Sequence, residues 1–154
     1  MSRGISAKRA ERMRYTWLIV EDSQSELYLL EKAIRDSALP IQLYSVPNGD
    51  HALGFLRREG AYTTAPPPHL ILLTIYVASR NGLETLVEIK TDPRLRRIPV
   101  VMWSMSARTE DIDTSYALGA NAYVRKPTSL GDHDAMVNVL FHFWCRAVEL
   151  PSLP

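Results

Sequence analysis

The sequence predicts an α/β fold in which a doubly wound, five-stranded parallel sheet is covered by helices. Short apolar runs alternate five times with longer segments of helical periodicity. No internal repeat and no linker-like segment interrupts this alternation. Parallel strands must be joined by crossover segments, so strict alternation favours a parallel sheet between two helical layers.

The first strand and helix are predicted before residue 41. Tyr15–Val20 is an apolar run typical of a strand. Ser23–Glu26 has the form of a capping box, which marks the start of a helix. This helix is expected to end at Leu39-Pro40, because the residue before a proline disfavours helical conformation. Its apolar face has three- and four-residue spacing and comprises Leu27, Leu30, Ala33 and Ile34.

The second strand, second helix and third strand are predicted next. Ile41–Val46 alternates as a strand does, and a loop at Pro47–Gly49 follows it. A helix then runs through Ala52, Leu53 and Leu56 and ends near Gly60. After a stiff approach loop at Ala65–Pro68, Leu70–Leu73 is continuously apolar. Such a run is typical of a strand that is buried on both faces.

The remaining elements complete the alternation. After a loop at Val77–Gly82, the predicted elements are a helix at Leu83–Thr91, a strand at Pro99–Ser104, a helix at Glu110–Leu118 closed by Gly119, a strand at Ala122–Val124 and a final helix from about Leu130 to Glu149. The prediction is therefore five strands and five helices.

Composition and charge narrow the class of protein. Of the 154 residues, 46% are hydrophobic and 23% are charged, as in a soluble globular domain. No apolar run approaches the roughly 18 residues that a membrane span requires, so no membrane partner is expected. The net charge is +1. This value indicates no global basic field, so no nucleic-acid partner is expected.

The predicted domain occupies residues 15–150, between a tail at residues 1–14 and a short end at residues 151–154. The tail carries five basic residues and one acidic residue and has too little apolar content to fold alone. Because it lacks the apolar middle of a secretion signal, we expect a cytoplasmic protein, whose translation in the cell could also begin at Met13. Cys145 is expected to be an inert thiol near a packed helix.

Polar residues gather where the predicted strands end. The first strand ends in Glu21-Asp22, and the third, fourth and fifth end at Thr74, at Ser104 and just before Lys126. In doubly wound sheets ligands bind beyond these carboxyl ends. Two adjacent carboxylates suit a hard cation, and a nearby lysine suits a phosphoryl oxygen. The alternative is a helix cap surrounded by surface charges.

These stretches resemble the receiver domain of two-component response regulators, which has a flavodoxin-like (βα)5 fold. The resemblance spans about Tyr15 to Glu149. Its matching stretches are Leu18–Asp22, Pro68–Thr74, Asn81–Glu84, Ile98–Ser104 and Gly119–Pro127. A narrower resemblance is to the subgroup that partners phytochrome histidine kinases. It rests on Ala61–Pro68, Glu88–Pro93, Phe143-Trp144 and Leu150-Pro151.

The resemblance assigns roles to the edge residues. It implies that Asp22 is a direct magnesium ligand, that Glu21 acts through water and that the Tyr76 carbonyl is a further ligand. Ser104 would contact a phosphoryl group, and Tyr123 would change rotamer with it. Lys126 would sense phosphate, and the Lys126–Pro127 bond would be cis. Thr74 stands where the family has the aspartate that accepts the phosphoryl group.

The threonine changes the expected chemistry. A threonine hydroxyl is a weak nucleophile until a base activates it, and a neutral hydroxyl is a poor ligand for magnesium. We therefore expect no cofactor, and Mg²⁺ binding that is weak or absent. Lys126 is expected to pair with Asp22 or Glu21, and Thr74 to donate to either, which would lock a metal-free site. Alternatively, Thr74 is merely a strand-end residue that suits its position.

The last predicted helix is apolar over more of its surface than one sheet face covers. Phe141, Phe143 and Trp144 are candidate interface residues, since aromatic residues anchor many interfaces. Receivers often dimerise through the neighbouring elements, so a homodimer using this face and the carboxyl-terminal segment is predicted. The alternative is a broad core stripe.

Three functions remain open at this stage. The favoured one is a degenerate receiver, not an enzyme, that acts by phosphorylation-independent protein–protein interaction. Its expected partner is a histidine kinase, which the narrower resemblance implies is a bacterial phytochrome. The second is a working phosphoacceptor for such a kinase that uses Asp22 or Thr74. The third is a small flavin or nucleotide binder, although no glycine-rich phosphate loop follows the first strand.

Overall fold

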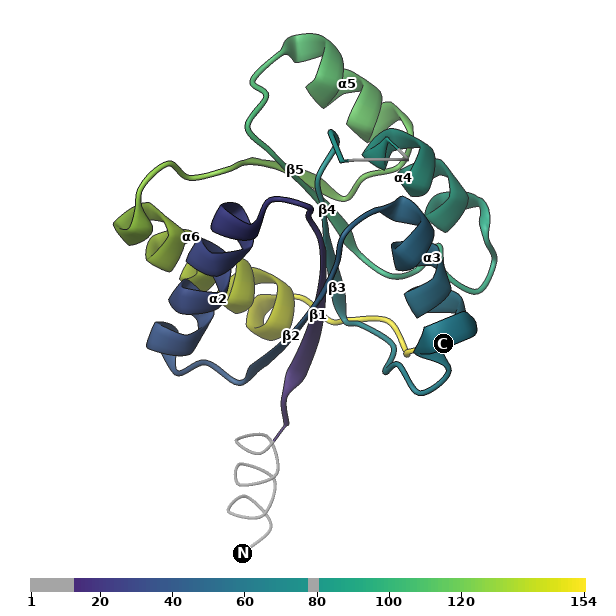
Figure 1. The fold of residues 1–154 in the computed structure, drawn as a ribbon, viewed down its shortest axis with the longest axis horizontal. Coiled ribbons are helices and arrows are strands. Elements are labelled where there is room, and N and C mark those ends of the chain that lie inside the picture. Colours follow the sequence, from purple (N-terminus) through teal and green to yellow (C-terminus); the bar gives the residue numbers. More distant parts are fainter. Residues whose placement is uncertain (1–12, 78–80) are drawn as a thin grey trace, which may run out of the picture.

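The computed structural model describes residues 13–77 and 81–154 and confirms the predicted α/β architecture (Figure 1). All strand pairs are parallel, and the sheet order is β2-β1-β3-β4-β5. The strands are β1 (Tyr15–Val20), β2 (Ile41–Val46), β3 (Leu70–Leu73), β4 (Val100–Ser104) and β5 (Ala122–Arg125). The predicted tail at residues 1–14 falls mostly outside the described residues, as does the centre of the loop at 77–82.

The five predicted helices are present, and two short helical segments accompany them. The helices are α2 (Gln24–Ser37), α3 (Gly49–Arg57), α4 (Gly82–Thr91), α5 (Thr109–Ala117) and α6 (Leu130–His142); the short segments are the 3-10 turn η1 (Gly60–Tyr62) and the π-helical turn η2 (Phe143–Ala147). Helices α2 and α6 cover one face of the sheet, and α3 and α4 cover the other (Figure 1). None of the helices that the structure describes combines the length and the apolar character of a membrane span.

Two apolar cores form because the central strands bury both faces. Along β1, Leu18 and Val20 face the core beneath α3 and α4, whereas Trp17 and Ile19 face the core beneath α2 and α6. Strands β3 and β4 alternate in the same way. The carboxyl ends of these buried strands form a rigid edge of the sheet, and this edge sets the positions of the polar residues that follow each strand.

Three details differ from the sequence-based expectations. The last α-helix ends at His142, and a π-turn carries the chain to Ala147. No cis peptide bond occurs among the described residues; Lys126–Pro127 is trans, the isomer that X–Pro bonds prefer by about 0.5–1 kcal/mol. Phe141 is 1% exposed and packs edge-on against Tyr15, so it is a core residue and not an interface residue.

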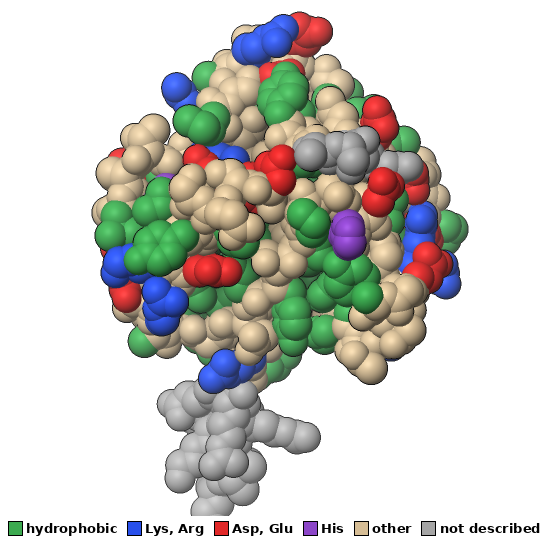
Figure 2. All heavy atoms as spheres, viewed as in Figure 1, with side chains coloured by type: hydrophobic (Ala, Val, Ile, Leu, Met, Phe, Trp, Pro, Cys, Tyr) green, Lys and Arg blue, Asp and Glu red, His purple; other side chains and the backbone are tan. Residues whose placement is uncertain are grey.

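Cys145 is buried and free, and burial raises the pKa of its thiol. A thiol that stays protonated is a poor nucleophile. The space-filling view shows acidic and basic side chains interspersed over one face of the molecule, in line with the net charge of +1 (Figure 2).

Candidate functional site

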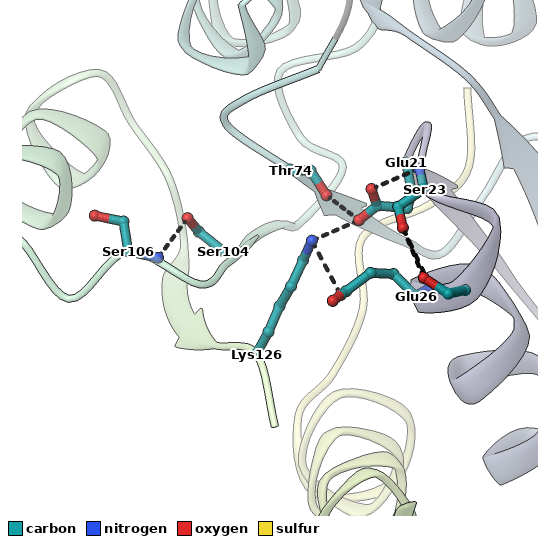
Figure 3. A network of polar contacts seen from close by, with 8 residues as sticks. Glu21, Ser23, Glu26, Thr74, Ser104, Ser106 and Lys126 are labelled. Carbon is teal, nitrogen blue, oxygen red and sulfur yellow. Dashed lines mark hydrogen bonds and ion pairs between the residues drawn. The ribbon is translucent and has the colours of Figure 1, made fainter. Parts of the chain in front are cut away.

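The candidate site lies at the carboxyl edge of the sheet, where the topology brings together residues distant in sequence. Glu21 follows β1, Thr74 follows β3, and Lys126 follows β5. Their side chains point toward one another across the strand ends (Figure 3). All three are buried, so their contacts form in a region of low dielectric constant, where electrostatic interactions are strong.

Glu21 is the centre of this arrangement. Its Oε2 accepts a hydrogen bond from the Thr74 hydroxyl at 2.9 Å and one from the Lys126 ammonium at 2.6 Å. Its Oε1 accepts the backbone N–H of Ser23 at 3.1 Å. Both carboxylate oxygens are therefore satisfied by the protein, as a buried charge requires.

Lys126 makes a second ion pair that the sequence did not indicate. Its Nζ lies 3.2 Å from Oε2 of Glu26, in the first turn of α2. We interpreted Glu26 as part of a capping box, and only half of that box forms: the Ser23 hydroxyl caps the Glu26 N–H, while Glu21 accepts the Ser23 N–H. The carboxylate of Glu26 is thus available for Lys126.

The structure resolves which carboxylate pairs with the lysine. Among the described residues, the carboxylates within 4.0 Å of the Lys126 ammonium belong to Glu21 and Glu26. Asp22 lies at the same edge but is exposed. The ion pair with Glu21 is 2.6 Å long between side chains that are 6% and 2% exposed. The expected lysine–carboxylate contact therefore forms, and Glu21 is its acceptor.

The donor set in this arrangement does not fit a divalent cation. Magnesium needs oxygen ligands with available lone pairs, whereas Oε2 of Glu21 already accepts from both Thr74 and Lys126. The Lys126 ammonium occupies the space between Glu21 and Glu26, where a cation would compete with it. No group of three or more His, Cys, Asp or Glu side chains within residues 13–77 and 81–154 is arranged to hold a metal.

Ser104 and Tyr123 both contact Ser106. The buried Ser104 hydroxyl accepts the backbone N–H of Ser106 at 3.1 Å (Figure 3). The Tyr123 hydroxyl donates to the backbone carbonyl of Ser106 at 2.8 Å. These two residues therefore hold the loop between β4 and α5 through the N–H and the carbonyl of one residue, Ser106.

A second polar group, formed by one carboxylate and two hydroxyls, adjoins that loop and was not predicted from the sequence. Asp111 in α5 accepts the Tyr76 hydroxyl at 3.1 Å on each oxygen and the Ser106 hydroxyl at 2.5 Å. The hydrogen bond from Ser106 is the main reason that the pKa of Asp111 is lowered, and the bond to Asp111 raises the pKa of Tyr76. The resemblance pointed to the Tyr76 carbonyl, so its side-chain role was not foreseen.

Gly82 keeps the chain close to Thr74. A Cβ at this position would overlap the Thr74 carbonyl oxygen, so the start of α4 approaches the strand end in a way that only glycine permits. The Gly82 N–H donates to the Ile75 carbonyl at 2.7 Å. Gly82 therefore holds the start of α4 against the end of β3, next to Thr74.

Of the candidate interface residues, Phe143 is 51% exposed and Trp144 is half-buried against the core of α2 and α6. Val139, one helical turn before Phe143, is 62% exposed. An apolar patch therefore lies on the outer side of α6 and η2, while Phe141 faces inward.

Comparisons with known proteins agree with this geometry. A model of the response regulator receiver domain matches residues 17–138. Response regulator Rcp1 of Synechocystis is 37% identical over 135 residues, which cover 88% of this chain and 92% of that protein. Two solved structures show the same fold. The phosphorylated cyanobacterial phytochrome response regulator RcpA has a TM-score of 0.85 at 37% identity, covering 91% of this chain and 100% of that one. The Mn²⁺-bound form of Rcp1 has a TM-score of 0.81 at 36% identity, and the match covers 90% of this chain and 99% of that one.

Proposed function

The chain belongs to the response regulator receiver domain family, and on that premise we propose that it signals through protein–protein contacts without accepting a phosphoryl group. It is related to the phytochrome response regulators. The observation that carries the proposal is the contact of both Thr74 and Lys126 with one oxygen of Glu21. In this reading Thr74 stands at the phosphoacceptor position.

The site has lost the nucleophile that this chemistry uses. An aspartate at this position would be ionised at neutral pH, whereas the Thr74 hydroxyl must lose its proton to attack. The nearest acceptor for that proton is Glu21. Lys126 contacts the same oxygen at 2.6 Å, so the oxygen that would have to take the proton is already engaged by an ammonium.

Lys126 replaces a bound cation as the positive charge of the site. It sits between Glu21 and Glu26, and its ammonium offsets one of their two negative charges. We infer that Mg²⁺ binding is weak or absent, because a metal would have to displace an ammonium that is already paired. The Mn²⁺-bound Rcp1 structure shows that a relative does hold a metal.

The exposed patch of Val139 and Phe143 supports a homodimer. A partner covering it would remove apolar surface from water, which stabilises association. We propose that this patch and the carboxyl-terminal segment bind a second copy of the chain, and that the other partner is a phytochrome-type histidine kinase in the cytoplasm.

A phosphoryl-transfer assay tests the central claim. A labelled phytochrome-type histidine kinase should transfer no phosphoryl group to the wild-type chain, while the Thr74→Asp variant should accept it in the presence of Mg²⁺. Thr74→Asn, a neutral replacement of similar size to aspartate, should stay unlabelled.

The chemistry of any label distinguishes the outcomes. A hydroxylamine-sensitive label on wild-type Asp22 would overturn the proposal. An acid-stable label on Thr74 would favour the second candidate function, a slow phosphoacceptor in which Glu21 takes the hydroxyl proton, as the 2.9 Å hydrogen bond between them allows. Failure of Thr74→Asp to accept label would contradict the claim that position 74 alone disables the site.

The dimer is tested by Phe143→Ser, which should shift the chain toward monomer in sedimentation equilibrium at equal protein concentration. Tyr28→Ser is the matched control, since Tyr28 is similarly exposed, at 56%, on α2. Wild-type chain that sediments as a monomer at tens of micromolar would contradict the prediction.

A further inference from the structure

A cavity lies at the opposite edge of the sheet from the candidate site. Its volume is about 510 Å³, within the range of small-molecule sites. It is open to solvent on one side and is lined by the start of β1, the residue before β3, the π-turn η2 and the carboxyl-terminal segment. Figure 1 shows this last segment crossing beneath the sheet from α6 toward the side of α3. None of the residues used above as receiver chemistry lines this cavity.

Three of the side chains that line the cavity, Tyr15, His69 and Arg146, can donate hydrogen bonds into it. His69 accepts the Thr16 N–H on Nδ1 at 3.0 Å. Burial lowers its pKa, so the ring is neutral at pH 7 and carries its proton on Nε2. Tyr15 accepts a hydrogen bond from Arg146 at 3.2 Å, which leaves its own O–H to donate. Arg146 contributes the remaining guanidinium N–H groups.

Arg146 is held in place by aromatic rings and lacks a carboxylate partner. Its guanidinium carbon lies 4.8 Å from the centre of the Phe141 ring and 5.5 Å from that of Tyr15. Among the described residues, no Asp or Glu is recorded within ion-pair distance of it. Glu149 also lines the cavity. A fixed guanidinium in a donor-lined cavity is suited to binding a planar carboxylate.

We propose that this cavity binds a small organic carboxylate. Arg146 would take the carboxylate oxygens, His69 and Tyr15 would donate further hydrogen bonds, and an apolar body would contact the apolar lining residues Val148, Leu150 and Leu153. Glu149 would oppose the ligand through like-charge repulsion. The site shares no residue with the Glu21–Thr74–Lys126 arrangement, although the carboxyl-terminal segment that lines it is also assigned to the proposed dimer contact.

The test is a titration of the full-length chain by ¹⁵N–¹H NMR with sodium benzoate, at constant ionic strength, with benzamide as the neutral isostere. Benzoate should give saturable shifts at the amides of Tyr15, His69 and Arg146, and benzamide should bind at least 5-fold more weakly. Arg146→Gln should weaken benzoate binding by a similar factor, whereas Glu149→Gln should strengthen it. Arg35→Gln, which removes an exposed arginine from α2, should leave it unchanged.

Each outcome decides the proposal. Absence of saturation up to about 20 mM benzoate, equal binding of benzamide, or unchanged affinity in Arg146→Gln would overturn it. Because Arg146 is exposed, its variant should fold normally. An unchanged ¹⁵N–¹H spectrum away from η2 would show that lost binding is not lost structure. A Glu149→Gln variant that binds more weakly would also overturn the proposal, since it would place the carboxylate of Glu149 among the ligand's partners.

Discussion

Helices α2 and α5 both follow a strand of the sheet, yet they are attached to it in different ways. Helix α2 buries four apolar residues, Leu27, Leu30, Ala33 and Ile34, and its first turn supplies Glu26 to the Lys126 ion pair. The residues that α5 buries are Asp111 and Ser115. Asp111 is held by hydroxyl groups, and the Ser115 hydroxyl donates to the Asp111 carbonyl.

The comparison separates two kinds of stability. Apolar burial contributes roughly 25 cal/mol per Å² and connects α2 to the whole core. Hydrogen bonds contribute about 0.5–1.5 kcal/mol each, and about 1.5–3 kcal/mol when one partner is charged. Helix α5 should therefore open locally at lower free energy than the rest of the domain, while breaking the Glu21–Lys126 pair should destabilise the domain globally.

The largest expected effect is that of Lys126→Met. Removing the ammonium leaves the Glu21 carboxylate buried without its countercharge, and breaking a buried pair in this way costs about 3–5 kcal/mol. Urea denaturation should show that loss in the free energy of unfolding. The double variant Glu21→Gln with Lys126→Met should recover much of it, because residue 21 then no longer carries a buried, unpaired charge. A loss below about 1 kcal/mol in the single variant would show that the pair is solvated.

The same contrast explains what the sequence could predict. The five strands and five helices followed from periodicity, and the approach of Glu21, Thr74 and Lys126 followed from parallel strand ends meeting at one edge. The partners within the site did not follow, since they depend on side-chain rotamers. Glu26 has the spacing of a capping residue. Its carboxylate instead contacts the Lys126 ammonium, which reaches it from the end of β5, and no local pattern indicates that contact.

The other misses have related physical causes. Phe141 lies off the main apolar stripe of its helix, but the end of that helix packs against Tyr15, and this contact buries the ring. The side-chain contact of Tyr76 with Asp111 joins the loop after β3 to helix α5, whose relative position no local pattern encodes. Sequence reasoning was therefore reliable for elements and strand ends, and unreliable for side-chain contacts between elements.

A smaller and more local effect is expected for Asp111→Asn. The variant removes the charge that receives the hydroxyls of Tyr76 and Ser106, at a cost of about 1–3 kcal/mol. Hydrogen exchange should accelerate at the amides of α5 and remain nearly unchanged in α2. Asp113→Asn is the matched control, since Asp113 is an exposed acid in the same helix. Equal acceleration in both helices would contradict the idea that α5 opens independently.

The smallest expected effect is the pH dependence of the stability that Asp111→Asn removes. Hydrogen bonding, chiefly from Ser106, lowers the pKa of Asp111 in the folded protein. A carboxyl with a lowered pKa contributes stability at pH values above its unfolded pKa of about 3.9, and this contribution is lost as the pH falls through the folded pKa. The difference in unfolding free energy between wild type and Asp111→Asn should be constant from pH 7 to about pH 5 and shrink below pH 4, whereas the difference for Asp113→Asn should stay near zero. A difference that grows on acidification would mean that Asp111 is protonated in the folded state at neutral pH, and α5 would then be held by a neutral hydrogen-bond network in place of a charged one.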